Sequence, residues 1–314
     1  MSLEAIAYCL PSRKQNSADI ALDTGVEEAF ISEKVGLRTR YILGPEETSV
    51  SLSIKACERL LEQTSSVKKE EIDLLVCVTQ NPDYRIPHNA GLVAHGLGLK
   101  TQLSSFDISL GCSGYVYGLQ IMEAMLGLPN MNTGVLVTCD PYSRIMEAKN
   151  KDTNCVFGDA AAATLVTNNG VHSKILGADW GTDGSGAESI MIPAGGAAKP
   201  LGGLLKDLQS NYGPDDLHLH MNGRNVFNFV MSRIPESIDN CLKRSGLTKA
   251  DIDYFVMHQG SSYMLKALAR RVGIDMAKVP INMDRFGNTV SSTIPMLLAD
   301  LDSEGRLNGR RILV

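Results

Sequence analysis

Hydrophobic and polar positions along the chain alternate in blocks that predict strands and helices in turn. The stretches 70–80 (EEIDLLVCVTQ) and 250–259 (ADIDYFVMHQ) each read as a polar linker entering a short apolar run, which is typical of a buried strand. The segments 113–126 and 292–301 are apolar with small residues on most faces, so they predict buried helices. Because helices and strands alternate, we expect an α/β protein whose sheets are sandwiched between helices.

This pattern occurs twice along the chain. Each copy of the strand is followed by a segment typical of a helix end with a glycine C-cap, at 94–99 (AHGLGL) and 269–274 (ARRVGI). An extended run then leads into one of the two buried helices. The offset between the copies stays near about 175 to 180 residues, which predicts duplicated halves, residues 1–169 and 170–314.

The repeat brings three polar side chains toward one place. Cys112 and Asn288 become equivalent, each at the start of a central helix near the axis that relates the halves. His258 follows the strand of the second half at about the position of Gln80 in the first. We therefore expect Cys112, His258 and Asn288 on the same side of the sheets, in the middle of the molecule.

Their chemistry is that of a thioester site. Taken alone, a buried cysteine or a histidine after a strand is more often part of the core. At a helix start, however, the free N–H groups and the dipole favour an anion, which predicts a lowered pKa for the Cys112 thiol. Gly111 and Gly114 allow a sharp turn and leave room for a substrate at the sulfur. With His258 and Asn288, the site has a nucleophile and two hydrogen-bond donors for an oxyanion.

Composition narrows the class of protein. The chain has 314 residues, 44% of them hydrophobic and 21% charged, with a net charge of -5, which indicates a soluble globular protein with core enough for two domains. The acidic balance argues against nucleic acid as a partner. Residues 1–14 predict a first strand rather than a signal peptide, because Glu4 breaks their apolar run and Pro11 ends it. No segment reaches the roughly 18 apolar residues of a membrane span.

Redox and metal chemistry are disfavoured. The seven cysteines are odd in number and contain no C-x-x-C pair, so neither a disulfide framework nor a structural zinc site is expected, and the compartment is a reducing cytoplasm. The glycines of 177–203 predict an irregular segment, because they lack the strand-then-helix order of a dinucleotide fingerprint. His218 and His220 share one face of a predicted strand without a third ligand, so we expect no metal there.

Six segments, in chain order, then carry a resemblance to a known family: DISLGCSGYVYGL, VFGDAAAATLV, DGSGAESIMIPAGG, MNGRNVF, VMHQGS and DRFGNTVSSTIP. They resemble the motifs of the β-ketoacyl-acyl-carrier-protein synthase III family, within the thiolase superfamily. The match spans nearly the whole chain. It implies a thiolase fold, in which duplicated halves form a five-layered αβαβα sandwich, and a homodimer.

The resemblance also implies a mechanism. Cys112 would take a starter acyl group from a thioester donor, and His258 and Asn288 would bind the carbonyl of a malonyl thioester while it loses CO2. The carbanion would attack the acyl group on Cys112 and give a β-ketoacyl product for fatty-acid or related synthesis. Neutral donors lower that barrier without metal or cofactor, so acyl coenzyme A and malonyl acyl carrier protein enter as substrates and no cofactor is expected. For this His258 must present an N–H to the oxygen.

The chain departs from the family where coenzyme A is held. Contacts to coenzyme A or pantetheine are implied at Phe30, Lys34, Lys151 and Ser261. Phe30 and Lys34 replace the family's adenine-clasping Trp and Arg, and Lys151 and Tyr263 replace further arginines. Since lysine lacks the planar fork of arginine, coenzyme A recognition is open here.

Other positions concern the partner and the acyl group. Arg270 and Arg271 stand where the family meets acyl carrier protein, although a solvated helix face would look the same. Ile86 aligns with a residue, often Phe, that reaches across the dimer to close the partner's acyl pocket, so its smaller size would admit a longer or differently shaped acyl group. Gln80 aligns near a Glu that serves as base in related enzymes that condense without decarboxylation, and an amide cannot take up that proton.

The end of the sequence and two other functions stay open. Family members continue beyond RRILV into a glycine-rich turn that supplies a backbone N–H to the acyl-enzyme oxyanion hole. Either such a tail follows Val314, which we expect, or half of the oxyanion hole comes from elsewhere. One alternative is an acyltransferase that moves the acyl group from Cys112 to an oxygen or nitrogen acceptor, with His258 as base. The other is a noncatalytic partner subunit, against which the retention of Cys112, His258 and Asn288 counts.

Overall fold

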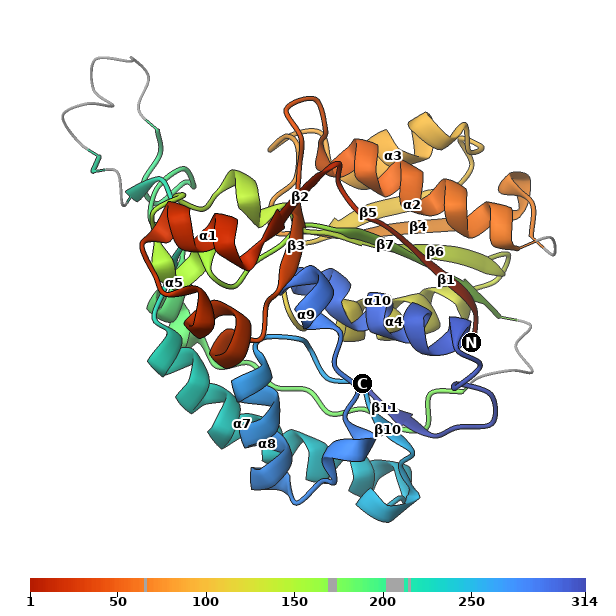
Figure 1. The fold of residues 1–314 in the computed structure, drawn as a ribbon. Coiled ribbons are helices and arrows are strands. Elements are labelled where there is room, and N and C mark those ends of the chain that lie inside the picture. Colours follow the sequence, from red (N-terminus) through yellow and green to blue (C-terminus); the bar gives the residue numbers. More distant parts are fainter. Residues whose placement is uncertain (65–66, 169–173, 202–211, 214–215) are drawn as a thin grey trace.

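Five layers make up the molecule. The computed structural model describes residues 1–64, 67–168, 174–201, 212–213 and 216–314. From top to bottom in Figure 1 the layers are a helix pair, α2 (Ser49–Gln63) and α3 (Asn89–Leu97), the first sheet, a second helix pair, a short second sheet and a third helix pair, α7 (Gly223–Ser245) and α8 (Ser262–Val272). The predicted αβαβα arrangement is visible in this view.

The first sheet has five strands in the order β1-β7-β6-β4-β5. These are β1 (Ser2–Cys9), β4 (Leu74–Val78), β5 (Ser104–Ile108), β6 (Thr133–Cys139) and β7 (Ala161–Thr167). β4 runs parallel to β5 and β6, whereas β7 pairs antiparallel with β6 and β1. Every residue of β4, β6 and β7 is buried, because helices cover both faces of the sheet.

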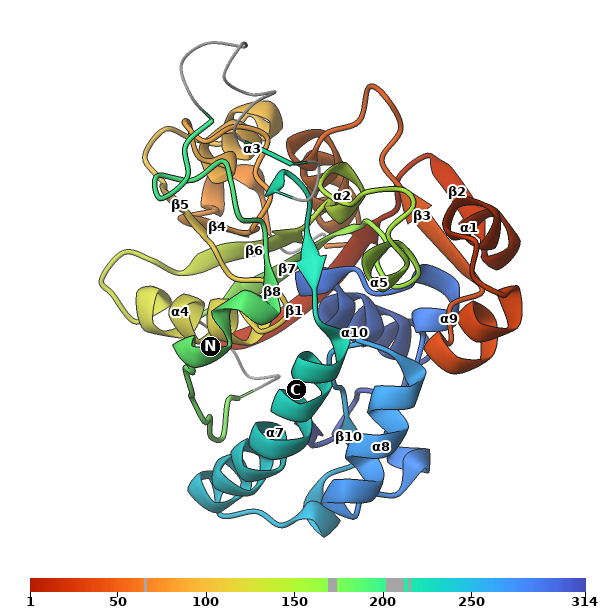
Figure 2. The same ribbon diagram turned by 90° about the vertical axis from the view of Figure 1, so that its left-hand side faces the viewer.

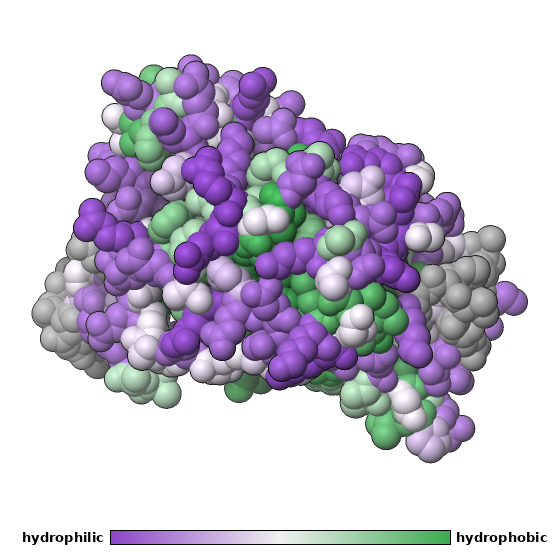
Figure 3. Space-filling model, turned by 90° about the horizontal axis from the view of Figure 1, so that it is seen from below, coloured by the Kyte–Doolittle hydropathy of each residue, from purple (hydrophilic) through white to green (hydrophobic). Residues whose placement is uncertain are grey.

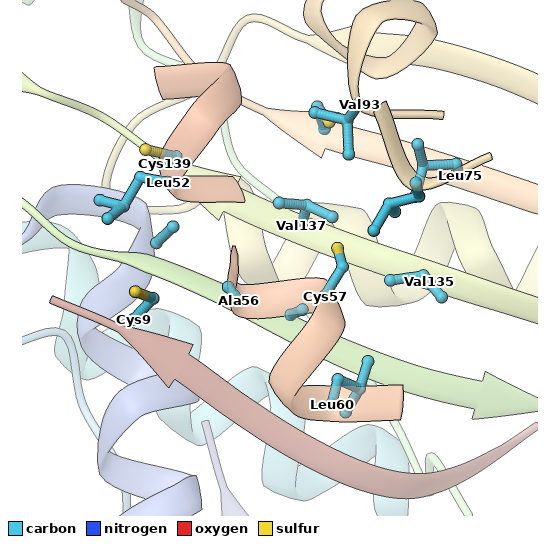
Figure 4. Packing of buried hydrophobic residues seen from close by; sticks show 14 of the residues in the cluster. Cys9, Leu52, Ala56, Cys57, Leu60, Leu75, Val93, Val135, Val137 and Cys139 are labelled. Atoms are coloured by element: carbon cyan, nitrogen blue, oxygen red, sulfur yellow. The ribbon is translucent and has the colours of Figure 1, made fainter. Parts of the chain in front are cut away.

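The upper face of this sheet carries a hydrophobic core. Figure 4 shows Leu52, Cys57 and Leu60 of α2 packed over strand residues such as Val135 and Val137. All five are nearly inaccessible to solvent. The cysteines of this layer are therefore packing residues, as their apolar surroundings require.

The central helix pair, α4 (Gly114–Leu126) and α10 (Thr293–Ser303), lies under the first sheet and confirms the expectation of two buried helices. Leu119 and Met122 of α4, Ile294 and Leu297 of α10, and Val76 of β4 belong to one buried cluster. Because each helix begins beside the same end of the sheet, the residues just before them come close together.

The second half repeats part of the first. β10 (Tyr254–Phe255) runs parallel to β11 (Ile312–Leu313), as β4 runs parallel to β6. Gly98 and Gly273 end α3 and α8 in the left-handed conformation, which confirms both predicted glycine C-caps. α7 and α8 pack side by side under this sheet (Figure 2). The predicted boundary between residues 169 and 170 lies outside the described residues.

Smaller elements make up the rest of the secondary structure in the described residues. They are β2 (Arg13–Asn16), α1 (Ser17–Thr24), a π-helix η1 (Phe30–Val35), β3 (Thr39–Ile42), η2 (Lys69–Glu71), η3 (Tyr142–Arg144), α5 (Lys151–Asn154), η4 (Gly184–Ser189), β8 (Ile190–Met191), β9 (His220–Met221), η6 (Lys249–Asp251), η7 (Met276–Lys278), α9 (Met283–Phe286) and η8 (Val290–Ser292). Within the described ranges, no helix is long and apolar enough to cross a membrane.

Candidate active site

The nucleophile candidate lies on a tight turn between β5 and α4. The Gly114 N–H donates to the Gly111 carbonyl at 2.8 Å, so Cys112 occupies the corner of the turn. A Cβ on Gly111 would lie 2.3 Å from the Gln80 Oε1 atom, and one on Gly114 would lie 2.3 Å from Val78. Both glycines are therefore required because the end of β4 packs against the turn, rather than for an unusual backbone conformation.

A large cavity connects this turn to the second half. It has a volume of about 2200 Å³, and both Cys112 and His258 line it, together with Gln80 and Tyr142. Hydrophobic side chains from α4, α7 and α8 make up much of its remaining wall. Seen from below, hydrophobic surface lies among hydrophilic residues in the middle of the molecule (Figure 3). An apolar cavity with a few polar groups is the usual form of a small-molecule site.

The electrostatics of Cys112 differ from the prediction. Burial raises the pKa of this thiol to about 12, and the negative charge of Asp140 adds to the rise. The Cys112 side chain is nevertheless exposed to the cavity, and water that reaches the sulfur opposes part of this effect. α4 begins only at Gly114, so Cys112 lies before the first helical residue and the helix dipole acts on its sulfur from further away. The direction is thus opposite to that expected from a helix start, and the thiol is protonated near neutral pH.

His258 follows β10 and is held from one side. Its Nδ1 atom lies 2.8 Å from the Thr293 hydroxyl on α10. The backbone carbonyl of Val290 also contacts the ring. Burial lowers the pKa of His258 to about 4, so the imidazole is neutral over the physiological range. A neutral ring has a single N–H, and which nitrogen carries it decides the function of this residue.

Backbone hydrogen bonds to the first half of the chain hold Asn288 in place. Its N–H donates to the Val156 carbonyl, and its carbonyl accepts from Gly158, each at 3.0 Å. A Cβ on Gly158 would lie 2.3 Å from the Phe286 carbonyl oxygen, which explains a glycine at this crossing. The side-chain Oδ1 of Asn288 accepts from the Val290 N–H at 2.9 Å. The oxygen is thereby occupied, and the Nδ2 amide is the end of the side chain left to donate.

Val290 joins the three predicted residues. This buried valine has a φ of +54°, which is a genuine outlier for a β-branched residue and costs roughly 1–3 kcal/mol. Its N–H holds Asn288, its carbonyl contacts the His258 ring, and its Cγ1 atom would lie 3.3 Å from a Cβ on Gly111 of the nucleophile turn. Asn288 is not among the described residues that line the cavity. The strained backbone at Val290 therefore brings the loop of Asn288, the His258 ring and the Cys112 turn together, with Asn288 behind the residues that line the cavity.

Three of the four residues predicted to hold coenzyme A, Phe30, Lys34 and Ser261, lie on two neighbouring elements. η1, with Phe30 and Lys34 exposed, packs against α8, whose N-cap is Ser261. Tyr263 is 61% exposed, and its ring lies 5.7 Å from that of Phe227. Lys151 is exposed at the start of α5. None of these positions is among the described residues that line the cavity.

The partner positions are exposed as well. Arg270 and Arg271 lie in the last turn of α8 with solvent-exposed side chains. Ile86 is 88% exposed on the loop between β4 and α3. His220 lies on β9 with His218 just before it, and no group of three metal-ligating side chains occurs in the part of the chain that the structure describes.

Besides Val290, sequence reasoning missed three residues of the site. Asp140, Tyr142 and Thr293 lie beside the predicted groups, and Tyr142 donates to Gln80 Oε1 at 2.7 Å. A usable signal was the charged residue in VLVTCDPYS, directly after an apolar strand. A carboxylate at the end of a fully buried strand is rare unless it is bonded.

Comparisons with known proteins show to which family the chain is similar. Family models described as 3-oxoacyl-acyl-carrier-protein (ACP) synthase III, and as its C-terminal part, match residues 106–184 and 242–314. The β-ketoacyl-acyl-carrier-protein synthase III of Acidiphilium cryptum is 30% identical, over 99% of this chain and 93% of its own length. That of Symbiobacterium thermophilum is 28% identical, over 100% of this chain and 93% of its own length.

Solved structures give the same result. A crystal structure of a 3-oxoacyl-(acyl-carrier-protein) synthase III is 32% identical, covers 99% of this chain and 94% of its own, and superposes with a TM-score of 0.90. A β-ketoacyl-acyl-carrier-protein synthase III from Thermus thermophilus is 26% identical with a TM-score of 0.88, covering 99% of this chain and 94% of its own.

Proposed function

Because this chain belongs to the β-ketoacyl-acyl-carrier-protein synthase III family and has the thiolase fold, we propose that the turn of Cys112 and the loop of His258 and Asn288 form its active site. The chain is an acyltransferase that condenses a starter acyl thioester with a malonyl thioester, with loss of CO2, in fatty-acid biosynthesis. Its relatives do not favour transfer of the acyl group to an oxygen or nitrogen acceptor. The supporting observation is the shared cavity of Cys112 and His258.

The first half-reaction loads the starter. The Cys112 sulfur attacks the carbonyl carbon of the acyl thioester, the bond to the donor's sulfur breaks, and the acyl group stays on Cys112. The thiol proton passes to the departing thiol, so this step needs no redox partner. Because burial raises the pKa of the Cys112 thiol, only a small fraction of it is the reactive thiolate near neutral pH.

The second half-reaction forms the carbon–carbon bond. The bond from the malonyl carbon to its carboxylate breaks, CO2 leaves, and the electron pair moves onto the thioester as an enolate. N–H groups of His258 and Asn288 stabilise the charge on that oxygen. The carbanion then attacks the acyl carbonyl and expels the Cys112 thiolate, which takes a proton from water. The groups named here balance the step without a metal or an organic cofactor.

The donor function sets a requirement on Thr293. The Val290 carbonyl can only accept, so it favours an N–H on the ring nitrogen that it contacts. The Thr293 hydroxyl contacts Nδ1, and when it donates to that atom, Nε2 carries the N–H that the enolate needs. Thr293 also lies 3.1 Å from the Val290 carbonyl, so its single hydrogen has two acceptors.

Thr293→Val should therefore lower malonyl decarboxylation by roughly 10-fold or more while leaving acylation of Cys112 near the unmodified rate, since one donor is misdirected. Thr293→Ser keeps the hydroxyl and should restore most of the rate. Stopped assays of acyl-enzyme mass and of CO2 release measure the two steps separately. Loss of acylation in Thr293→Val, with decarboxylation retained, would instead make His258 a base for the thiol.

The function as a whole is tested by product analysis. Incubation with a panel of acyl thioesters, followed by intact-protein mass measurement, identifies the starters that load Cys112. Addition of a malonyl thioester on carrier protein should then release one CO2 for each β-ketoacyl product. Transfer of the acyl group to an alcohol or amine without CO2 would contradict the proposal.

Partners and location follow from the family as part of this proposal. We propose a cytoplasmic homodimer that receives its malonyl group on acyl carrier protein. The exposed Ile86 supports a dimer arm, because an aliphatic side chain that is 88% accessible gains by burial against a partner. Arg270 and Arg271 support docking of an acidic carrier helix.

Reversal of both charges, Arg270→Glu with Arg271→Glu, should raise KM for the carrier-bound substrate several-fold and leave turnover of a short pantetheine thioester nearly unchanged. The difference should shrink with salt above about 0.1 M, because screening removes the attraction. The matched control reverses Arg13 and Lys14, an exposed basic pair on β2. Equal losses on both substrates would mean that the two arginines support the fold.

The residues that stand where the family contacts coenzyme A affect which acyl donor this chain uses. Phe30, Lys34 and Lys151 are all exposed and lack a guanidinium fork. We propose that a carrier-protein thioester is a better substrate than the coenzyme A thioester of the same acyl group in at least one half-reaction. Comparison of kcat/KM for the two donors tests this, and a strong preference for coenzyme A in both half-reactions would overturn it.

A further inference from the structure

Asp140 is a buried carboxylate that the mechanism above does not use. It follows β6 directly and is fully inaccessible to solvent. Its Oδ1 atom accepts from the Gln80 backbone N–H at 2.7 Å. Its Oδ2 atom accepts from the Ser291 hydroxyl, and the Ser291 N–H lies 3.4 Å away. One side chain thus bonds the segment after β4 in the first half to η8 in the second half.

The two bonded segments are those that carry the active site. Gln80 packs its Oε1 atom against Gly111, so it supports the turn of Cys112. Ser291 lies in η8, between Asn288 and the Thr293 that contacts His258. Any movement of Asp140 would therefore change the position of the sulfur relative to the two donors.

No cation balances this carboxylate among the described groups that act on it. Hydrogen bonds from Ser291, Gln80 and Thr79 stabilise its charge, while burial raises the pKa of Asp140 to about 6. The titratable neighbours on the packed elements are thiols and a phenol: Cys139 on β6, Cys112 on the turn before α4, and Tyr142 on η3. Burial raises the pKa of each, and the Asp140 charge adds to the rise. Such a carboxylate is costly to bury, and a group of this kind beside a nucleophile is a candidate for function.

We propose that Asp140 is a positioning residue whose carboxylate holds the Cys112 turn in register with the loop of Asn288 and His258, so that the acyl group and the enolate meet. This inference rests on the proposed function, and it adds a residue outside the Cys, His and Asn set. The ionised carboxylate accepts all of these bonds, whereas a proton on Oδ1 would face the Gln80 N–H and a proton on Oδ2 would reverse the bond to the Ser291 hydroxyl and face the Ser291 N–H.

The pH dependence follows from the raised pKa. The carboxylate is ionised above about pH 6 and protonated below it. Condensation should therefore fall as the pH drops through about 6, before His258, with a pKa near 4, takes up its proton. Asparagine at position 140 cannot titrate, so condensation by Asp140→Asn should not show this fall near pH 6.

The decisive experiment measures two rates that should change in opposite directions in the same variant. Asp140→Asn should lower the rate of condensation at least 10-fold. The same variant should speed alkylation of Cys112 by iodoacetamide at pH 8, about tenfold for each unit by which the thiol pKa falls, because the negative charge beside the sulfur is gone. Ser291→Ala removes one bond but keeps the charge, so it should slow condensation and leave alkylation unchanged.

Controls separate positioning from mere stability. Asp159→Asn changes another buried carboxylate, whose bonds go to Leu43 and Ser143, and it should leave Cys112 alkylation unchanged even where it lowers Tm. The proposal would be overturned if alkylation and condensation slow equally in Asp140→Asn. It would also be overturned if condensation by this variant still falls as the pH drops through about 6. If Asp140→Asn fails to fold, normal condensation in Ser291→Ala overturns it. Alkylation needs no substrate, so failure of the proposed condensation would be seen separately, as absent product with the alkylation results unaffected.

Discussion

Cys112→Ala should abolish acyl transfer completely, with no acyl mass added to the protein and no β-ketoacyl product. The expectation rests on position, because Cys112 is the exposed thiol of the turn that faces the cavity. Cys57, Cys77 and Cys139 lie in the core of the first half, where burial raises the pKa of each and blocks access. Intact-protein mass spectrometry after incubation with an acyl thioester measures the result.

The matched control is Cys241→Ala. Cys241 also lines the cavity and is partly exposed, but it lies on α7. Acyl mass should be unchanged in this variant, and peptide mapping of the unmodified protein should place the acyl group on Cys112. Acylation that persists in Cys112→Ala would contradict the assignment of the nucleophile.

The raised pKa of Cys112 adds a pH dependence to this result. The thiolate is the reactive form, and its fraction grows about tenfold per pH unit below the pKa. Alkylation of Cys112 should therefore still rise between about pH 7 and pH 10. A plateau near neutral pH would indicate a lowered pKa, as a helix start alone predicts.

His258→Ala and Asn288→Ala should each lower the rate of malonyl decarboxylation by about 10² to 10³-fold, because each deletes one donor to the developing enolate oxygen. Acylation of Cys112 should continue, since neither side chain is required for that half-reaction in the proposed mechanism. Asn288→Asp is the matched control for shape, because it keeps the volume and replaces the donor amide with an acceptor. It should be as inactive as Asn288→Ala.

The two half-reactions must be measured apart. Acyl-enzyme mass without malonyl substrate gives the first, and release of labelled CO2 gives the second. If His258→Ala loses acylation first, the histidine serves as a base to the thiol.

The sequence by itself predicted the fold, and it supplied the candidate site residues. The repeated strand and helix-end patterns made Cys112 and Asn288 equivalent, and both α4 and α10 begin where the apolar segments predicted. Local spacing could do this because periodicity decides which face of an element is buried. The close packing that forces Gly111 and Gly114 beside β4 was consistent with the predicted turn.

Only the tertiary structure decided how these groups behave. The sequence predicted a lowered pKa for Cys112 from its helix, yet burial and the charge of Asp140, 28 positions further along the chain, raise it. Thr293 contacts His258 and Ser291 bonds Asp140 across 35 and 151 positions. A pKa depends on every charge and solvent path around a group, and those are set by segments that meet only when the chain is folded.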